Sequence, residues 1–233
     1  MEKRLILYYA FILTGAVLSG ISGYITGKKK GFPKNPLKSF VIMALVFGVA
    51  GAMAMGQLQN FIMSLTGLDF AVSRMRIFGG LLFTPLLIYF PVKYLSGDYP
   101  LFCDIIAPGA FLILGFSKIG CAVYGCCYGI ACVPGVSTPF EEHTVFPVQL
   151  LESLLCFILY GVLLYLVTKN KHRKGQAYPL ALILYGTVRF LVEFLRYYPE
   201  AQKALFLGMS FWQIVSIASV VSGGIWLIRK CRV

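Results

Sequence analysis

Runs of about twenty apolar residues, separated by short polar stretches, recur along the whole chain. A run of that length can cross the roughly 30 Å hydrocarbon core of a bilayer as a helix. In lipid the backbone polar groups must be satisfied within the segment, so each run is predicted to be helical. A secretory signal peptide would explain only the first run. We predict spans at residues 5–26, 39–64, 77–92, 103–122, 148–168, 177–196 and 209–228.

The composition agrees with this pattern. Hydrophobic residues make up 58% of the chain and charged residues 13%, and the mean hydropathy is +0.79. The exterior of a soluble domain needs more polar surface than that. We therefore expect an all-α polytopic membrane bundle of about seven transmembrane helices, with residues 1–233 forming a single domain. Pro85, Pro91 and Pro108 are expected to interrupt the third and fourth spans.

The net charge of +12 indicates topology rather than nucleic-acid binding. Thirteen of the twenty-one Lys and Arg residues lie in 28–38, at Lys93, and in 169–174 and 229–232. With seven spans these places share one side, which the positive-inside rule makes cytoplasmic. The loops on the other side hold the acids Asp69, Glu141, Glu142 and Glu200. The sequence thus predicts a multi-pass protein of a bacterial cytoplasmic membrane, with an external N-terminus, a cytoplasmic C-terminus and some attraction to anionic lipids.

Four of the seven cysteines, Cys121, Cys126, Cys127 and Cys132, fall within twelve residues on the predicted outer side. They lie at the start of an external segment, about 123–147, whose Gly, Pro and Cys content favours a structured cap. One interpretation is a disulfide that braces this cap. Another is a reactive thiolate, with His143 as a candidate base. The spacing matches no zinc pattern, so neither a metal nor another cofactor is predicted.

Ionisable residues inside spans are costly and usually functional. Tyr185, Arg189, Glu193 and Arg196 follow one another at spacings of four, four and three, so they share one face of the sixth predicted helix. Arg189 and Glu193 can pair across one turn, and a guanidinium held in this way suits bidentate binding of a phosphate. The alternative is an ion pair that only fixes helix packing.

Further polar and glycine positions cluster at the same outer level of other spans. Gly79 and Gly80 also suit close helix packing. Together these positions could bind an anionic head group, with the lipid tails between helices. The positions are Arg74, Arg76, Gly79, Gly80, Lys118, Cys121, Gly129, Gln149 and Glu152.

In this order the segments resemble the bacterial phosphatidylglycerol–prolipoprotein diacylglyceryl transferase family. The most specific match is Tyr185 to Arg196, which resembles the family's Tyr-Gly-x-x-Arg-x-x-x-Glu-x-x-Arg. Weaker matches are Phe78-Gly79-Gly80, Ser117 to Cys126, Phe146 to Glu152 and Gly208 to Gln213. The resemblance covers about residues 76–228. It implies seven spans with an external N-terminus, and transfer of a diacylglyceryl group from phosphatidylglycerol to a lipoprotein-precursor cysteine.

The resemblance also implies residue roles. Arg189 and Lys118 would bind the lipid phosphate, with Glu193 orienting Arg189. Substrate binding would further involve Tyr185, Arg196, Gly79, Gly80, Cys121, Gly129, Gln149 and Glu152.

The sequence departs from the family pattern at several positions. Phe78 and Phe146 stand where the family has histidines, and Lys118 stands in place of an arginine. Cys121 and Cys126 replace an asparagine and a glutamate. Cys126 and Cys127 are therefore candidate replacement catalytic residues.

Two other function classes stay open. A membrane thiol oxidoreductase, or a lipid transferase with a cysteine nucleophile, would depend on Cys126 or Cys127 more than on Arg189. A non-catalytic protein that binds or transports phosphatidylglycerol or another anionic phospholipid would need Arg189 but form no product.

Overall fold

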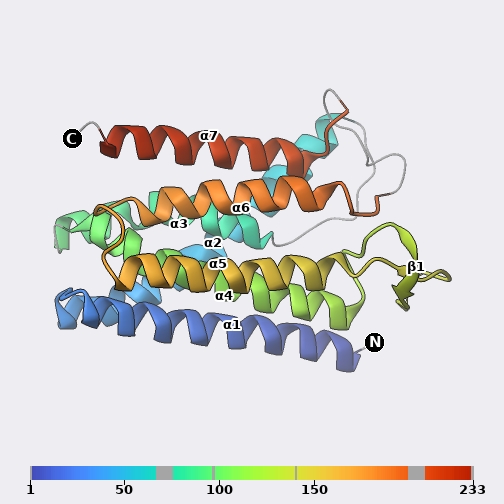
Figure 1. The fold of residues 1–233 in the computed structure, drawn as a ribbon, viewed down its shortest axis with the longest axis horizontal. Coiled ribbons are helices and arrows are strands. Elements are labelled where there is room, and N and C mark those ends of the chain that lie inside the picture. The colour runs from blue at the N-terminus through green and yellow to red at the C-terminus, as the bar shows by residue number, and fades with distance from the viewer. Residues whose placement is uncertain (1, 67–75, 96–97, 140, 199–207, 232–233) are drawn as a thin grey trace.

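The computed structural model describes all residues except 1, 67–75, 96–97, 140, 199–207 and 232–233, and the predicted Asp69, Arg74 and Glu200 lie outside the described residues. The described residues form a bundle of long helices with one short strand at its outer end (Figure 1). The elements are α1 (Glu2–Lys29), α2 (Lys34–Thr66), α3 (Ile77–Leu95), α4 (Tyr99–Tyr124), β1 (Ala131–Val136), α5 (Val148–Thr168), α6 (Ala177–Glu193) and α7 (Phe211–Cys231).

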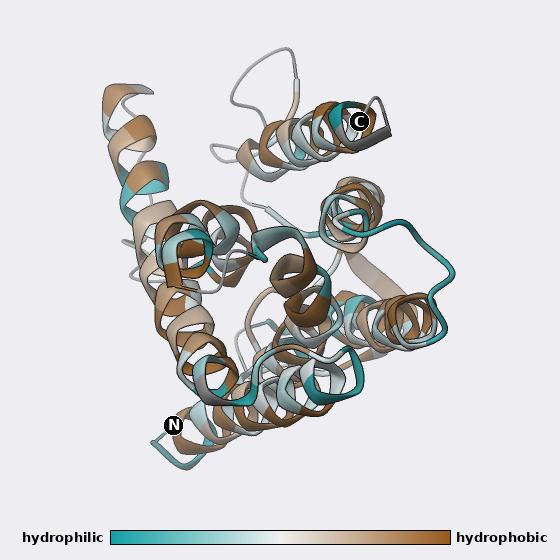
Figure 2. Ribbon diagram, turned by 90° about the vertical axis from the view of Figure 1, so that its left-hand side faces the viewer, coloured by the Kyte–Doolittle hydropathy of each residue, from teal (hydrophilic) through white to brown (hydrophobic). Residues whose placement is uncertain are grey.

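The all-α bundle expected from the hydrophobic pattern is confirmed. Six of the described helices are long and apolar enough to cross a membrane. The seventh, α6, has 17 residues and carries Arg189 and Glu193. The N- and C-termini lie at opposite ends of the bundle, as an odd number of spans requires (Figure 1). The end that holds the C-terminus has hydrophilic connections between brown, apolar helices (Figure 2).

The prolines do not interrupt the third and fourth spans, which corrects the sequence prediction. Pro85 and Pro91 lie inside α3, and Pro108 lies inside α4. Pro85 has no N–H to donate to the carbonyl of Leu81 four residues earlier. The hydroxyl of Tyr178 donates to that carbonyl at 2.8 Å instead. A hydrogen bond from another helix therefore compensates for the bond that Pro85 removes.

Small residues bring α2 and α3 into close backbone contact. A Cβ added at Gly79 would lie 2.5 Å from the carbonyl oxygen of Gly51, and one at Gly80 would lie 2.8 Å from that of Gly48. Any larger side chain there would push the two helices apart. The helix-packing interpretation of Gly79 and Gly80 thus holds.

A buried aspartate in α4 anchors the start of α6. Asp104 accepts hydrogen bonds from the backbone N–H groups of Gly175 (2.5 Å) and Ala177 (2.8 Å), and its Oδ2 lies 3.1 Å from Nε2 of His172. The hydrogen bond to Asp104 raises the pKa of His172 above its ordinary value. Asp104 was not among the residues predicted from the sequence, although an acid within an apolar span is a signal that could have found it.

Candidate functional site

A buried carboxylate, Glu152 of α5, lies at the centre of a cationic cluster at the outer level of the bundle. Its Oε2 is 2.9 Å from Nζ of Lys118 on α4 and 3.8 Å from Nη2 of Arg196, which follows α6. Its Oε1 is 4.0 Å from Nε of Arg189 and accepts a hydrogen bond from Tyr185 at 2.8 Å. Three helices thus bring together residues that the sequence placed in three separate motifs.

A second carboxylate holds Arg189 from the other side. Nη1 of Arg189 lies 2.5 Å from Oε2 of Glu193, which confirms the pairing predicted from their spacing. Oε1 of Glu193 accepts hydrogen bonds from the hydroxyls of Ser210 (2.8 Å) and Tyr198 (2.6 Å). Glu193 therefore both fixes the guanidinium and links α6 to the start of α7. Tyr198 was missed from the sequence because no periodicity relates it to the helix.

The cluster carries more positive than negative charge. Arg76 and Arg189 both lie over the ring of Trp212, with guanidinium carbons 5.5 and 5.7 Å from its centroid. With Lys118 and Arg196 these make four cations around two carboxylates. Nε of Arg76 and both Nε and Nη2 of Arg196 are buried and make no hydrogen bond within the described residues. Buried donors without an acceptor are costly, so the cluster is suited to binding an anion.

Three thiols converge beside this cluster. The Sγ atoms of Cys121, Cys126 and Cys127 all lie within 4.8 Å of one another. The chain curls tightly here, since the N–H groups of Gly125 (2.9 Å) and Cys126 (3.1 Å) both donate to the carbonyl of Cys121. Gly125 has φ of 96° and Cys127 has φ of 61°. A non-glycine residue with positive φ is uncommon and often marks a functional site.

Cys121, Cys126, Cys127 and Cys132 are free thiols, so the disulfide that the sequence left open is not formed among them. Hydrogen bonds from the thiols of Cys121 and then Cys126 lower the pKa of Cys127, and the charges of Arg196 and Lys118 act in the same direction. Cys127 is accordingly the thiol best suited to be a thiolate.

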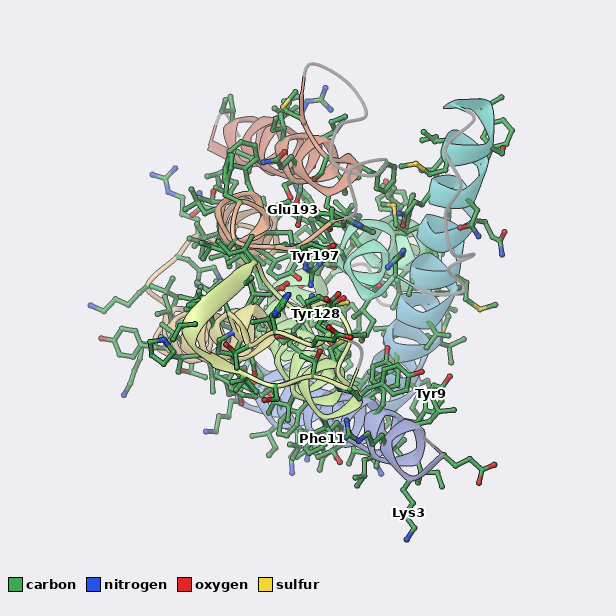
Figure 3. All side chains as sticks on the ribbon, turned by 90° about the vertical axis from the view of Figure 1, so that its right-hand side faces the viewer. Lys3, Tyr9, Phe11, Tyr128, Glu193 and Tyr197 are labelled. Atoms are coloured by element: carbon green, nitrogen blue, oxygen red, sulfur yellow. The ribbon has the colours of Figure 1, made fainter. Side chains whose placement is uncertain are left out.

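The thiol segment is clamped between α5 and the end of α6. Nε2 of Gln149 donates to the carbonyl of Cys126 at 2.7 Å. Gly129 forms a backbone bridge with Arg196, and a Cβ added there would lie 2.6 Å from the carbonyl oxygen of Leu195. The rings of Tyr128 and Tyr197 stack at 5.7 Å, and Figure 3 shows them close to Glu193 when the bundle is viewed from its outer end. The clamp therefore fixes the thiols relative to the arginines.

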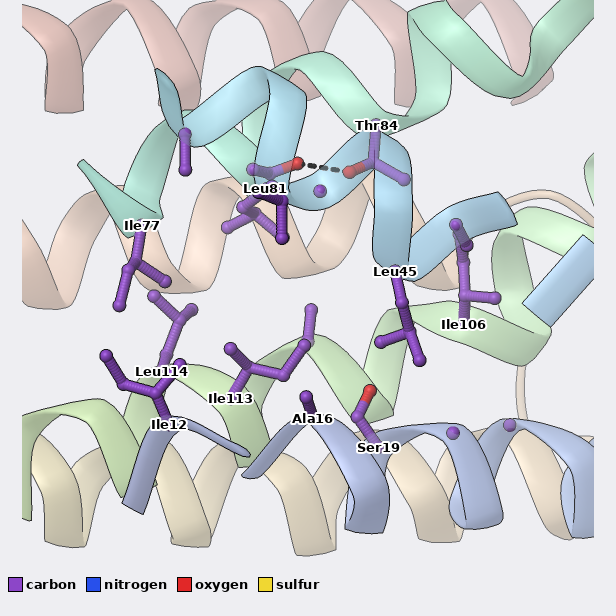
Figure 4. Close-up of a pocket in the computed structure, with 18 of the residues that line it drawn as sticks. Ile12, Ala16, Ser19, Leu45, Ile77, Leu81, Thr84, Ile106, Ile113 and Leu114 are labelled. Carbon is purple, nitrogen blue, oxygen red and sulfur yellow. Dashed lines mark hydrogen bonds between the residues drawn. The ribbon is translucent and has the colours of Figure 1, made fainter. Parts of the chain in front are cut away.

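An apolar cavity of about 530 Å³ lies between α1, α2, α3 and α4 (Figure 4). Ile12, Leu45 and Leu114 line it, and Gly80 forms part of its wall, whereas Gly79 lies in the contact with α2. At its outer end it includes Ile77, the neighbour of Arg76. Tyr8 also lines the cavity, and a Cβ added at Gly120 would lie 3.1 Å from its ring. Tyr8 is close enough to the three thiols to interact with them electrostatically. A lipid tail could thus lie in the cavity with its head group at the cations.

The two phenylalanines at the family's histidine positions have different surroundings. Phe78 is buried, with its ring 4.8 Å from that of Tyr185 in an edge-to-face contact. Phe146 is half-buried, and its carbonyl accepts from the N–H of Gly129 at 3.0 Å. His143, the candidate base, is exposed in the segment between β1 and α5.

Comparison with known proteins gives one consistent result. The sequence profile described as "Prolipoprotein diacylglyceryl transferase" matches residues 3–229. The chain is 26% identical over 226 residues to the phosphatidylglycerol–prolipoprotein diacylglyceryl transferase of Clostridium tetani, covering 93% of this chain and 89% of that protein. It is 25% identical over 230 residues to the one from Finegoldia magna, covering 96% and 91%. It is also 34% identical over 127 residues to transferase 2 of Clostridium perfringens, covering 52% and 48%.

Proposed function

This chain belongs to the prolipoprotein diacylglyceryl transferase family, and we propose that it transfers the diacylglyceryl group of phosphatidylglycerol to the cysteine thiol of a lipoprotein precursor. The observation that supports this most is the cluster of buried cations at the outer end of an apolar cavity. Such a pairing of charge and apolar volume fits an anionic phospholipid better than a soluble metabolite.

The head group would bind at the arginines. The unpaired N–H groups of Arg196 and Arg76 can donate to the oxygens of a phosphate in addition to the existing ion pairs. Lys118 adds a point charge on the side where α4 meets the thiols. Glu152 and Glu193 orient the cations and prevent the empty site from carrying four uncompensated positive charges. The net surplus of two positive charges is then available to a phosphate.

The acyl chains would lie in the cavity between α1, α2, α3 and α4. Its lining is largely apolar, and it runs from Tyr8 and Ile77 at the outer end inward to Thr84 and Ile106. Acyl chains need such an apolar lining, whereas the glyceryl carbon that reacts must lie close to the cations and thiols. The glyceryl carbon would then lie at the boundary between the cavity and the cations.

The reaction needs charge stabilisation more than acid catalysis. A thiolate attacks the glyceryl carbon, a C–S bond forms, and the C–O bond to the phosphate breaks. Glycerol phosphate leaves with one more negative charge than the phosphodiester carried, and Arg189, Arg196 and Lys118 would stabilise that charge. A nucleophilic cysteine of the enzyme itself is a poorer choice, since its product would be a stable thioether with no good leaving group. We therefore assign the attacking sulfur to the lipoprotein precursor.

The orientation follows from the charge pattern and the position of the site. The protein would lie in a bacterial cytoplasmic membrane with the N-terminus, β1 and the cationic cluster outside. The donor would be drawn from the outer leaflet, where secreted precursors arrive.

Transfer can be tested with purified protein in detergent, phosphatidylglycerol and a peptide that contains a lipobox cysteine. The readout is a peptide whose mass increases by one diacylglyceryl group, together with release of glycerol phosphate. Arg189→Ala should abolish both signals. The matched control is Arg173→Ala, because Arg173 is exposed at the cytoplasmic end and should not affect transfer.

Two outcomes would favour other functions. If the wild type binds phosphatidylglycerol in an Arg189-dependent way but forms no product with a working donor and peptide, the protein is a lipid-binding member of the family. If peptide thiols are oxidised instead of alkylated, and Cys126→Ser abolishes this reaction, the oxidoreductase hypothesis replaces transfer.

A further inference from the structure

The three converging thiols have no role in the proposed transfer as described for the cations and the cavity. The Sγ atoms of Cys121, Cys126 and Cys127 approach one another, although Cys121 lies five positions before Cys126 and Cys126 and Cys127 are adjacent in sequence. Two left-handed residues, Gly125 and Cys127, produce the curl that aims all three side chains at one point. The clamp from Gln149 and Arg196 holds this loop in place. A shape that requires uncommon backbone at Cys127 calls for an explanation beyond packing.

Three thiolates at this spacing match the ligand set of a soft metal ion. Zinc binds thiolate sulfur at about 2.3 Å, so tetrahedral ligands lie about 3.8 Å apart. The observed limit of 4.8 Å is reached from that value by small side-chain rotations. Catalytic zinc sites characteristically have three protein ligands and one open position. The sequence spacing matched no zinc pattern, because Cys126 and Cys127 are adjacent in sequence. Only the curl of the chain brings both of their thiols close to that of Cys121.

We propose that Cys121, Cys126 and Cys127 bind one zinc ion and that the cysteine thiol of the acceptor peptide occupies its open fourth position. This inference rests on the proposed transfer, and it identifies how the acceptor is activated. A metal-bound thiol loses its proton at neutral pH. The proton passes to bulk water, the sulfur attacks the glyceryl carbon, and the C–O bond to the phosphate breaks so that glycerol phosphate leaves. The thioether product then leaves the metal because it is a weaker ligand than a thiolate. No oxidation or reduction occurs.

Two further observations fit a thiol-activating metal. The chain has two histidines, of which His172 is bonded to Asp104 near the start of α6 and His143 is exposed, so neither is a buried imidazole base beside the thiols. Zinc with three thiolates carries one negative charge, which rises to two when the acceptor thiolate binds. Lys118 lies one turn of α4 before Cys121, and Arg196 bridges the backbone of Gly129 just after the thiols. The same cations can stabilise both the thiolate site and the leaving phosphate.

Metal content is the first test. Wild-type protein purified with zinc in the buffer should contain about one zinc per chain after dialysis. Cys121→Ser, Cys126→Ser and Cys127→Ser should each lower this below about one tenth. Cys132→Ser, in the same outer segment but outside the cluster, is the matched control and should keep the zinc. Cys126→His should recover the metal, since imidazole is also a zinc ligand, and this recovery would show that the loss in Cys126→Ser is not due to misfolding.

Cobalt substitution tests the fourth position. Co²⁺ in a thiolate site gives a sulfur-to-metal charge-transfer band and intense visible bands if it is tetrahedral. A lipobox peptide should strengthen the charge-transfer band, whereas the same peptide with serine in place of cysteine should not.

The outcomes separate this inference from the proposed function. One zinc per chain and a cysteine-dependent spectral change, without any diacylglyceryl transfer, would support the metal site while the transfer proposal fails. Transfer by metal-free protein, or undiminished transfer by a Cys126→Ser, Cys127→Ser double variant, would overturn the metal site and leave the transfer standing. Wild-type protein that retains no zinc and no cobalt after dialysis would also overturn it.

Discussion

Replacing Glu152 by glutamine tests whether one buried carboxylate holds the cations of the site together. Glutamine has nearly the same size and can still accept the hydrogen bond from Tyr185. It removes the negative charge that lies 2.9 Å from Lys118, 3.8 Å from Arg196 and 4.0 Å from Arg189. Glu193 would then be the one carboxylate left to compensate the cluster described above.

The expected loss of stability in Glu152→Gln follows from the burial of the Glu152 side chain. Removing one partner of a buried ion pair costs about 3–5 kcal/mol, because the remaining charge is left uncompensated. The side chain of Lys118 is 13% exposed, so water screens part of its charge, whereas that of Glu152 is fully buried. We therefore expect the lower end, about 3 kcal/mol. For a chain of this size this corresponds to a fall in Tm of roughly 6–12 °C.

Thermal unfolding in detergent measures the fall in Tm of Glu152→Gln, with Glu142→Gln as the matched control. Glu142 is exposed in the outer segment, so its substitution should change stability by no more than about 0.5 kcal/mol. Adding Lys118→Met to Glu152→Gln removes the nearest cation and should recover about 1 kcal/mol. Phosphatidylglycerol should raise the Tm of Glu152→Gln more than that of the wild type, because its phosphate replaces the missing charge, and phosphatidylcholine should not.

A fall in Tm no larger than that of Glu142→Gln would refute the electrostatic reasoning. So would an equal effect of phosphatidylcholine and phosphatidylglycerol, since only the second lipid carries the net negative charge that the cluster would need. A strongly destabilised Glu152→Gln variant that Lys118→Met does not rescue would show that shape, rather than charge, makes Glu152 necessary.

Three other predictions concern the bundle itself. Gly79→Ala should lower stability by about 1–3 kcal/mol by overpacking the α2–α3 contact, as measured by Tm in detergent, and an unchanged Tm would contradict the close packing. His172→Gln should destabilise by about 1 kcal/mol at pH of about 5.5. Because the bond to Asp104 raises the pKa of His172, this stabilisation is present below the unfolded pKa of about 6.5 and is lost as pH rises through the folded pKa, so the difference in Tm should shrink with pH. An impermeant maleimide should label Glu142→Cys in intact cells but Lys171→Cys only after permeabilisation, and the reverse pattern would invert the topology.

Much of the fold could be predicted because it depends on local properties of the chain. The span at 148–168 matches α5 residue for residue, the predicted starts at 77 and 177 match those of α3 and α6, and the remaining ends differ by two to five residues. The predicted interruption of α3 was wrong, because neighbouring residues do not show that the hydroxyl of Tyr178 donates to the carbonyl of Leu81, which Pro85 leaves without a helical partner.

The candidate site was predictable only in part. The spacing of Arg189 and Glu193 gave their ion pair, since four residues make one helical turn. It could not reveal that Glu152 meets Lys118 and Arg196, because these residues come from three segments whose contacts depend on helix packing. Trp212, whose ring lies against Arg76 and Arg189, was not predicted as a site residue, because an aromatic residue in an apolar span does not stand out in the sequence.

The sequence by itself determined which segments are apolar enough to cross a membrane and which residues share a helical face, and it predicted which loops share one side of the bundle. These properties depend on composition and on the helical period, so they can be inferred from neighbouring residues. Only the tertiary structure decided that Cys121, Cys126 and Cys127 converge, that Asp104 binds both His172 and the start of α6, and that an apolar cavity lies between α1, α2, α3 and α4. The physical reason is that these features arise where separate helices and an uncommon backbone turn meet, and no local pattern in the chain encodes such distances.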